Sequence, residues 1–427
     1  MIIDAYFHEP TEAMIEDMAR RAQRTIEQAR TDMEVMRVES LAEMKRDSFR
    51  CGFQPDIWVI CRAMLDVPWC RTDVTARIAE RWGWDEAVAW KKFKDRLMER
   101  HGYKQFVRYL LGIGANRSGK SRCAASLSNE ACMYDPGSII RLLCENEKKS
   151  KEEQQSDVWN TMPVEWRHSS NTNGAYIVHN SDATGFGNNR FITENGSNVR
   201  FSFYGQKLDN VMESGGVKWM FPDEKMPVDW AKAAFYRLAD RNGRMLLTFT
   251  PTKGYTPTVK LWQEGMQVNR MSVAWMLPRD GGEPLPWREI GVTREEYHEI
   301  MLAHKERRGA KAPQSRPEDC LGWADTDGVK AGAPIDMGPG RKPRLFEAVP
   351  RMAACADPNK GIVWFHCGDN PWGNPALVMR DARQIGIDDL KTRVYGLALK
   401  QWSAKFPRFR ESVHCVDGAD WLRKETA

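Results

Sequence analysis

The stretch GANRSGKS, residues 114–121, constrains this chain more than any other segment. Two glycines with four residues between them, followed by Lys120 and Ser121, have the spacing of a Walker A loop, which wraps the phosphates of a nucleotide. The glycines let successive backbone N–H groups curl around the phosphates, and the N-terminus of the following helix adds a positive end. The apolar run YLLGI at 109–113 precedes the loop, and a helix is expected over 118–128, which is the context that the motif requires.

The loop predicts ATP as ligand and Mg²⁺ as cofactor. Lys120 is expected to reach the β- and γ-phosphates, and the Ser121 hydroxyl to complete the Mg²⁺ shell. Arg117 supplies a further positive charge for the transition state. The predicted ATP-binding residues are Gln105, Gly114, Ala115, Asn116, Arg117, Ser118, Gly119, Lys120 and Ser121. For Gln105, in YKQF before the first strand, the role is to hold the adenine edge through its amide, and a plain surface residue is the alternative.

A second signal is VKWMFPDE at 217–224, an apolar strand that ends in two carboxylates. Asp223 at such a strand end can hold Mg²⁺ through water, as a Walker B aspartate does, and Glu224 can polarise the attacking water. This pair predicts hydrolysis of ATP, with Glu224, Lys120 and Arg117 as catalytic residues and Ser121 and Asp223 as metal ligands. The alternative is that Asp223 or Glu224 caps the next helix.

A third signal is RMLLTFTPTKG at 244–254, another strand with hydroxyls at its end. If this strand lies beside the acidic one, Thr248 and Thr250 come near the γ-phosphate. Together with Pro251 they are predicted to couple hydrolysis to movement. A turn that Pro251 starts is the alternative.

Short apolar runs that alternate with helical stretches predict an α/β fold with a mainly parallel sheet. The expected strands are 109–113, 138–144, 217–221, 244–249, 271–275 and 361–367. The alternating segment 190–204 turns at Asn195-Gly196 and predicts an added antiparallel hairpin. The fold class is therefore a P-loop NTPase, preceded by an all-helical N-terminal region.

Four parts are expected along the chain. Residues 1–100 form the helical region, with one long helix at 11–48 and a basic helical hairpin at 72–100. That hairpin has the pattern of a DNA-reading unit, but also of any hairpin with a solvated basic face. Residues 101–280 form the ATPase core, 281–360 a Gly/Pro/charge-rich insertion or linker, and 361–427 the C-terminal part of the ATPase region.

Composition excludes several classes. The chain has 42% hydrophobic and 28% charged residues, as ordinary globular proteins do. No apolar run approaches the roughly 20 residues of a membrane span, so no membrane partner is expected. The cysteines include no Cys-x-x-Cys pair, which disfavours zinc or a disulfide framework. A net charge of +5 permits a polyanionic partner without requiring one.

The order and spacing of several motifs resemble the large subunit of bacteriophage terminases, over about residues 100–416. These motifs are GANRSGKS, ENGSNVRFSFYGQ at 194–206, VMESGGVKWMFPDEKMP at 211–227, TFTPTKG at 248–254, DNPWGNP at 369–375, TRVYGLALK at 392–400 and FPRF at 406–409. The resemblance implies a motor that moves double-stranded DNA into a procapsid. It also implies a homo-oligomeric ring on the portal, a small terminase subunit as partner, and work in the host cytoplasm rather than in the mature virion.

The resemblance also raises questions. In that family a neighbouring subunit supplies an arginine, for which Arg190, Arg237 and Arg241 are candidates. The family's C-terminal nuclease is expected to be absent here, although Asp357 before the apolar run 361–367 is a candidate for its first metal ligand. Two other functions stay open, namely another DNA translocase or helicase, and a non-enzymatic DNA-tethering protein with a relic nucleotide loop.

Overall fold

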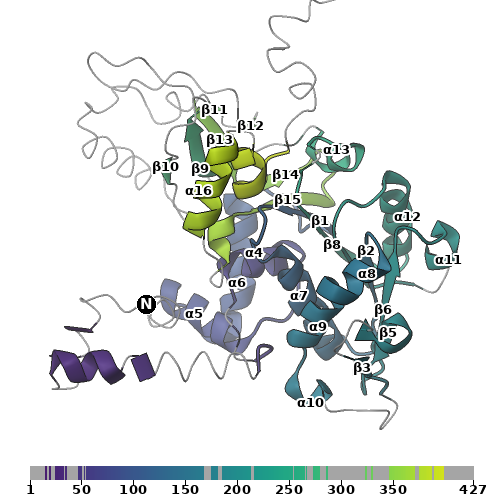
Figure 1. Ribbon diagram of the computed structural model, residues 1–427, viewed down its shortest axis with the longest axis horizontal. Helices are drawn as coiled ribbons and strands as arrows, with labels where there is room; N and C mark the ends of the chain where they lie inside the picture. Colours follow the sequence, from purple (N-terminus) through teal and green to yellow (C-terminus); the bar gives the residue numbers. More distant parts are fainter. Residues whose placement is uncertain are drawn as a thin grey trace, which may run out of the picture.

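A computed structural model describes residues 15–16, 19–20, 25–32, 34–35, 47–50, 52, 54–167, 175–180, 185–212, 216–252, 254–264, 266, 273–278, 285–286, 323–324, 328–329, 346–370, 375–386 and 389–398. Its centre is an eight-stranded sheet with the order β14-β15-β1-β8-β7-β2-β6-β5 (Figure 1). The strands are, in that order, Met352–Ala354, Lys360–Phe365, Tyr109–Gly114, Arg244–Phe249, Trp219–Pro222, Ile139–Cys144, Asn198–Phe203 and Arg190–Ile192.

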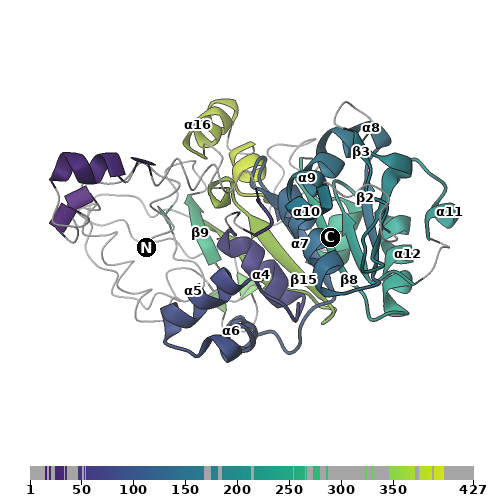
Figure 2. The same cartoon turned by 90° about the horizontal axis from the view of Figure 1, so that it is seen from below.

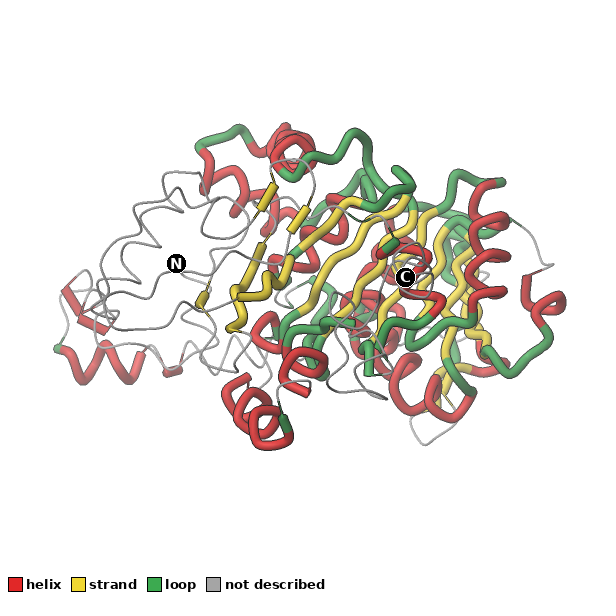
Figure 3. Tube along the Cα trace, turned by 90° about the horizontal axis from the view of Figure 1, so that it is seen from above, coloured by secondary structure: helices red, strands yellow, loops and turns green. Residues whose placement is uncertain are grey.

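The six inner strands run parallel, and each edge carries one antiparallel strand. The inner strands are short and almost fully buried, because helices cover both faces of the sheet (Figure 3). Neighbouring residues of a strand point to opposite faces. Leu110 of β1 therefore joins one hydrophobic cluster, whereas Leu111 joins the other.

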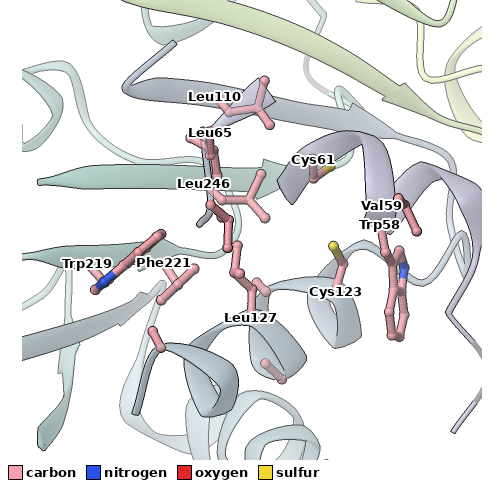
Figure 4. Packing of buried hydrophobic residues seen from close by; sticks show 14 of the residues in the cluster. Trp58, Val59, Cys61, Leu65, Leu110, Cys123, Leu127, Trp219, Phe221 and Leu246 are labelled. Atoms are coloured by element: carbon pink, nitrogen blue, oxygen red, sulfur yellow. The ribbon is translucent and has the colours of Figure 1, made fainter. Parts of the chain in front are cut away.

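The helices divide between these two clusters. One face packs against α4 (Asp56–Met64), α6 (Glu86–Arg100), α7 (Lys120–Tyr134) and α9 (Gln155–Asn160). In Figure 4, Cys61 of α4 faces Cys123 of α7, and Leu65, which follows α4, lies beside Leu110 and Leu246 of the strands. The other face packs against α12 (Val228–Ala239) and α13 (Pro257–Gln263).

Further elements complete the fold. They are α5 (Thr72–Trp82), α8 (Glu147–Lys149), a π-helical turn (Ser150–Gln154), α10 (Val164–Arg167), α11 (Leu208–Met212), α16 (Pro375–Ile385) and a second π-helical turn (Leu390–Val394). Small sheets pair β9 (Val273–Pro278) with β10 (Leu285–Pro286) and β13 (Phe346–Pro350), β11 (Trp323–Ala324) with β12 (Gly328–Val329), and β3 (His179–Asn180) with β4 (Gly185–Phe186). Figure 2 shows α4, α5 and α6 together along one side of the sheet.

The predicted fold class is confirmed. The phosphate loop follows β1 and leads into α7, the carboxylates follow β7, and β8 lies between β1 and β7. The hairpin at 190–204 is the antiparallel pair β5–β6, with Gly196 at φ 83° in its turn. The helical pair at 72–100 is α5 and α6. Of the long helix predicted at 11–48, most residues lie outside those that the structure describes.

Two expectations need correction. The apolar run 271–275 is not a strand of the main sheet, because Val273–Pro278 pairs antiparallel with β10 and β13 instead. The segment 281–360 is not a linker throughout, since β13 and β14 lie within it and β14 pairs with β15. Apolar character alone does not reveal which neighbour a strand pairs with. No helix among the described residues has both the length and the hydrophobicity to cross a membrane.

Candidate active site

The phosphate loop lies at the carboxyl end of β1, where ligands bind in open parallel sheets. Asn116 donates its backbone N–H to the Arg393 carbonyl, and Ala115 donates to the Phe365 carbonyl. Among the described residues, the N–H groups of Arg117, Ser118 and Gly119 have no hydrogen-bond acceptor. The loop therefore presents three consecutive donors, a cradle that suits the oxygens of a phosphate.

Left-handed backbone shapes this cradle. Arg117 and Gly119 have φ values of 56° and 81°, so the chain reverses sharply before α7 begins. Gly114 lies so close to Gly396 that the Cα atom of Gly114 would be 2.5 Å from a Cβ placed at Gly396. The loop is therefore packed against the C-terminal segment as well as against its own helix.

Lys120 is buried in the loop, and its Nζ atom donates to the Ala115 carbonyl at 3.0 Å. Ser118 donates to the same carbonyl at 2.9 Å. Burial lowers the pKa of the Lys120 ammonium, while the charges of Asp223 and Glu224 oppose that shift. These carboxylates are about a hundred residues away in sequence, so the fold has brought the lysine and the acidic strand end together, as the sequence predicted.

Asp223 is the centre of the site. It is buried, and its Oδ1 atom accepts a hydrogen bond of 2.7 Å from the Thr248 hydroxyl, with Ser121 and Lys120 of the phosphate loop beside it. Burial, and next the charge of Glu224, raise the pKa of Asp223, whereas Thr248, Lys120 and Ser121 lower it. A buried carboxylate with these neighbours suits a divalent cation, because the metal charge would offset the cost of burial.

Glu224 has a strained backbone and a cationic partner. Its φ value of 64° lies in a region that non-glycine residues rarely occupy, and its N–H donates to the Thr248 carbonyl at 2.7 Å. Its Oε1 atom lies 3.0 Å from Nζ of Lys149, on α8. Burial lowers the pKa of Lys149, but the bond and charge of Glu224 outweigh it and raise that pKa. Nothing in the sequence pattern pointed to Lys149.

The remaining candidates lie as follows. The Arg117 side chain is exposed and makes no ion pair among the described residues, so it is available to a ligand. Thr250 follows β8, and the Pro251 carbonyl accepts from the Gly254 N–H in a turn. Whether Thr248, Thr250 and Pro251 couple hydrolysis to movement stays a prediction.

Gln105 is not near the phosphate loop. It precedes the amino end of β1, and its amide donates to the Asn359 side chain at 3.4 Å, just before β15. The six residues of β1 span roughly 17 Å at about 3.3 Å per residue, so Gln105 belongs to the opposite edge of the sheet. The predicted adenine contact is therefore wrong. A residue that precedes β1 lies at the amino end of this strand, whereas the phosphate loop lies at its carboxyl end.

Two residues that lacked a predicted role border the loop instead. Asn370 donates its amide to the Arg117 carbonyl at 2.7 Å. Trp58 of α4 lies near the same glycine, with its indole nitrogen 3.7 Å from a Cβ placed at Gly119, and this buried N–H has no acceptor among the described residues. Asn370 belongs to the DNPWGNP motif, and this motif was the only sequence signal for a residue beside the loop. No sequence signal pointed to Trp58.

Other sequence candidates lie away from the loop. Arg241 precedes β8 and so lies at the opposite edge of the sheet, with Arg237 one turn earlier in α12. Arg190 opens the edge strand β5, with its guanidinium 5.7 Å from the Tyr176 ring. Asp357 precedes β15, and β15 pairs with β1, so the candidate nuclease strand belongs to the main sheet together with the phosphate loop.

Comparisons with known proteins add little to this geometry. No protein-family model matches the chain, and no curated protein matches it. Two solved structures of the large terminase ATPase domain of Thermus phage P74-26 are similar to it. A mutant form is 14% identical, with a TM-score of 0.36 over 72% of this chain and 98% of that one. A second form is 15% identical, with a TM-score of 0.28 over 50% and 91%. At these values we rest no argument on the likeness.

Proposed function

We propose that this chain hydrolyses ATP with Mg²⁺ as cofactor and uses the energy as a motor subunit that moves double-stranded viral DNA into a procapsid. The observation that carries the ATPase part is the buried Asp223, which is hydrogen-bonded to Thr248 and lies beside Ser121 and Lys120 of the phosphate loop. The order of the terminase-like motifs supports the DNA-packaging part.

The residues divide the chemistry as follows. The free N–H groups of the loop and Lys120 would hold the phosphates, and Arg117 would add positive charge. Ser121 and Asp223 would hold Mg²⁺, which when bound neutralises charge on the phosphate oxygens. Glu224 would orient the attacking water and accept its proton as the bond to the γ-phosphorus forms and ADP leaves.

Lys149 suggests how turnover is restrained. In its ion pair with Lys149, the Oε1 atom of Glu224 is occupied by the ammonium group and is not free to hold the attacking water. Glu224 would have to leave this pair, or share it with the water, before each cycle.

The proposal extends to partners by the motif resemblance alone. It comprises non-specific contact with DNA phosphates, a homo-oligomeric ring on the portal of the procapsid, a small terminase subunit, and action in the host cytoplasm. By the same resemblance, a neighbouring subunit would supply an arginine to the site.

The test is steady-state ATP hydrolysis by the purified chain, with and without linear double-stranded DNA and a capsid preparation. Glu224→Gln should lower turnover by roughly 10²- to 10⁴-fold while nucleotide binding persists. The exposed Glu194→Gln is the matched control and should leave the rate unchanged. An ATP hydrolysis rate that is unchanged in Glu224→Gln, or no turnover under any condition, would contradict an ATPase at this site. Stimulation by DNA without capsid would favour another translocase.

A further inference from the structure

The turn between α5 and α6 is held rigidly by its own backbone. Gly83 is left-handed, with φ 64°, and ends α5, while the Trp84 N–H donates to the Ala79 carbonyl. Asp85 then caps α6 by accepting from the Ala87 N–H at 2.8 Å. Both helix ends are thus satisfied within four residues, so the two tryptophans of the turn have fixed positions.

Those tryptophans stack on each other at the surface. The Trp82 and Trp84 rings are 5.2 Å apart and nearly parallel, and both are half-buried against the cluster that includes Phe93. A pair of large aromatic rings at the tip of a hairpin offers electron-rich faces, which attract cations.

Three exposed cations occupy those faces. The Arg81 guanidinium lies 5.2 Å from the Trp82 ring, and Lys92 and Arg96 lie 5.8 Å and 5.9 Å from the Trp84 ring. Among the described residues none of the three forms an ion pair, although Asp85, Glu86, Asp95 and Glu99 belong to the same hairpin. Two other basic side chains of this helical region are neutralised, in the pairs Arg71–Asp73 and Lys94–Asp66.

We infer that this surface, formed by Arg81, Trp82, Trp84, Lys92 and Arg96, binds the phosphate backbone of double-stranded DNA. This inference rests on the proposed function, which identifies the polyanion as DNA. Cations held by aromatic rings keep their charge while losing less freedom when they meet a ligand, so they form a prepared site for an anion. The hairpin thus supplies a DNA grip separate from the nucleotide loop.

The chemistry of this surface favours the DNA backbone over two other occupants. The ring faces are already covered by each other and by the cations, so unpaired bases cannot stack on them as they do in single-strand binders. A protein partner would need an apolar centre, and the only exposed large apolar side chain described on this hairpin is Val88. We therefore expect contacts without sequence preference and with strong salt dependence.

The experiment measures binding of the full chain to a labelled linear duplex by fluorescence anisotropy, without nucleotide, over a series of salt concentrations. The variant combines Arg81→Gln, Lys92→Gln and Arg96→Gln. The control combines Lys104→Gln, Lys207→Gln and Lys232→Gln, which removes the same charge from other exposed positions. The surface variant should bind the duplex at least about tenfold more weakly. The slope of log affinity against log salt concentration should become shallower by up to roughly three, which is about one for each lost phosphate contact.

A second readout separates this idea from the proposed function. ATP hydrolysis without DNA should be equal in the surface variant and the parent, and Trp84→Phe should retain most of the affinity that Trp84→Leu loses. Equal losses in both triple variants would mean that only net charge matters and would overturn the site. Unchanged DNA binding with lost binding of a purified small terminase subunit would assign the surface to a protein instead.

Discussion

The Thr248 hydroxyl donates a hydrogen bond of 2.7 Å to Oδ1 of Asp223, across the carboxyl ends of two neighbouring parallel strands. Asp223 in turn lies beside Ser121 and Lys120 of the phosphate loop. The phosphate loop and the ends of β7 and β8 therefore meet at one buried carboxylate. A change in the charge of Asp223 would alter its interactions with all three segments.

Thr248→Val should lower ATP turnover by about fivefold to 150-fold, since the loss of a bond to a buried carboxylate costs about 1–3 kcal/mol and about 1.4 kcal/mol is tenfold in rate. The hydrogen bond from Thr248 lowers the pKa of Asp223, so its loss should also favour the protonated form, which binds Mg²⁺ poorly. The Mg²⁺ dependence of the rate checks this. Thr252→Val, at an exposed position, should behave as the parent. Full activity in Thr248→Val would remove Thr248 from the site.

Asn370→Ala should weaken nucleotide binding about fivefold to tenfold, because one hydrogen bond of about 1 kcal/mol to the Arg117 carbonyl is lost. Titration with a fluorescent ATP analogue measures the affinity. Gln105→Ala is the paired variant, and it should leave the affinity unchanged, since Gln105 lies at the other edge of the sheet. The opposite pattern would restore the adenine role to Gln105.

Glu130→Ala should destabilise the protein by about 3–5 kcal/mol, because it leaves the buried Arg62 charge without its partner. Arg62 on α4 makes a bidentate ion pair with Glu130 on the phosphate-loop helix α7, and both side chains are at most 5% exposed. Urea unfolding measures the change. Glu152→Ala, which breaks the exposed pair with Lys148, should cost at most about 0.5 kcal/mol. Comparable losses in both variants would rule out burial as the cause.

Acid should destabilise the protein partly through His366. Burial lowers the pKa of His366 from 6.5 to about 3, so the unfolded chain binds more protons than the folded one between these values. Stability therefore falls as the pH drops through this window, by about 2 kcal/mol from this group between about pH 7 and about pH 5. His366→Asn keeps an acceptor for the Gly368 N–H but cannot titrate. Its loss of stability over the same range should be smaller by that amount, as urea unfolding at both pH values can show.

The local sequence determined the parts of this protein that depend on short-range chemistry. The spacing of GANRSGKS fixed a phosphate loop between a buried strand and a helix, Asn195-Gly196 fixed a hairpin, and Gly83 ended a helix. Each depends on backbone conformations that a few neighbouring residues decide. The alternation of apolar strands with helices was enough to predict the parallel sheet, because buried strands need apolar residues on both faces.

Only the tertiary structure decided which distant groups meet. It brought Lys149 to Glu224 and Asn370 to Arg117, and it separated Gln105 from the loop by the length of β1. It also placed Val273–Pro278 in a separate small sheet and not in the main one. The order of the strands and the edge of the sheet at which a residue lies depend on packing across the whole core. A local pattern of residues does not contain this information.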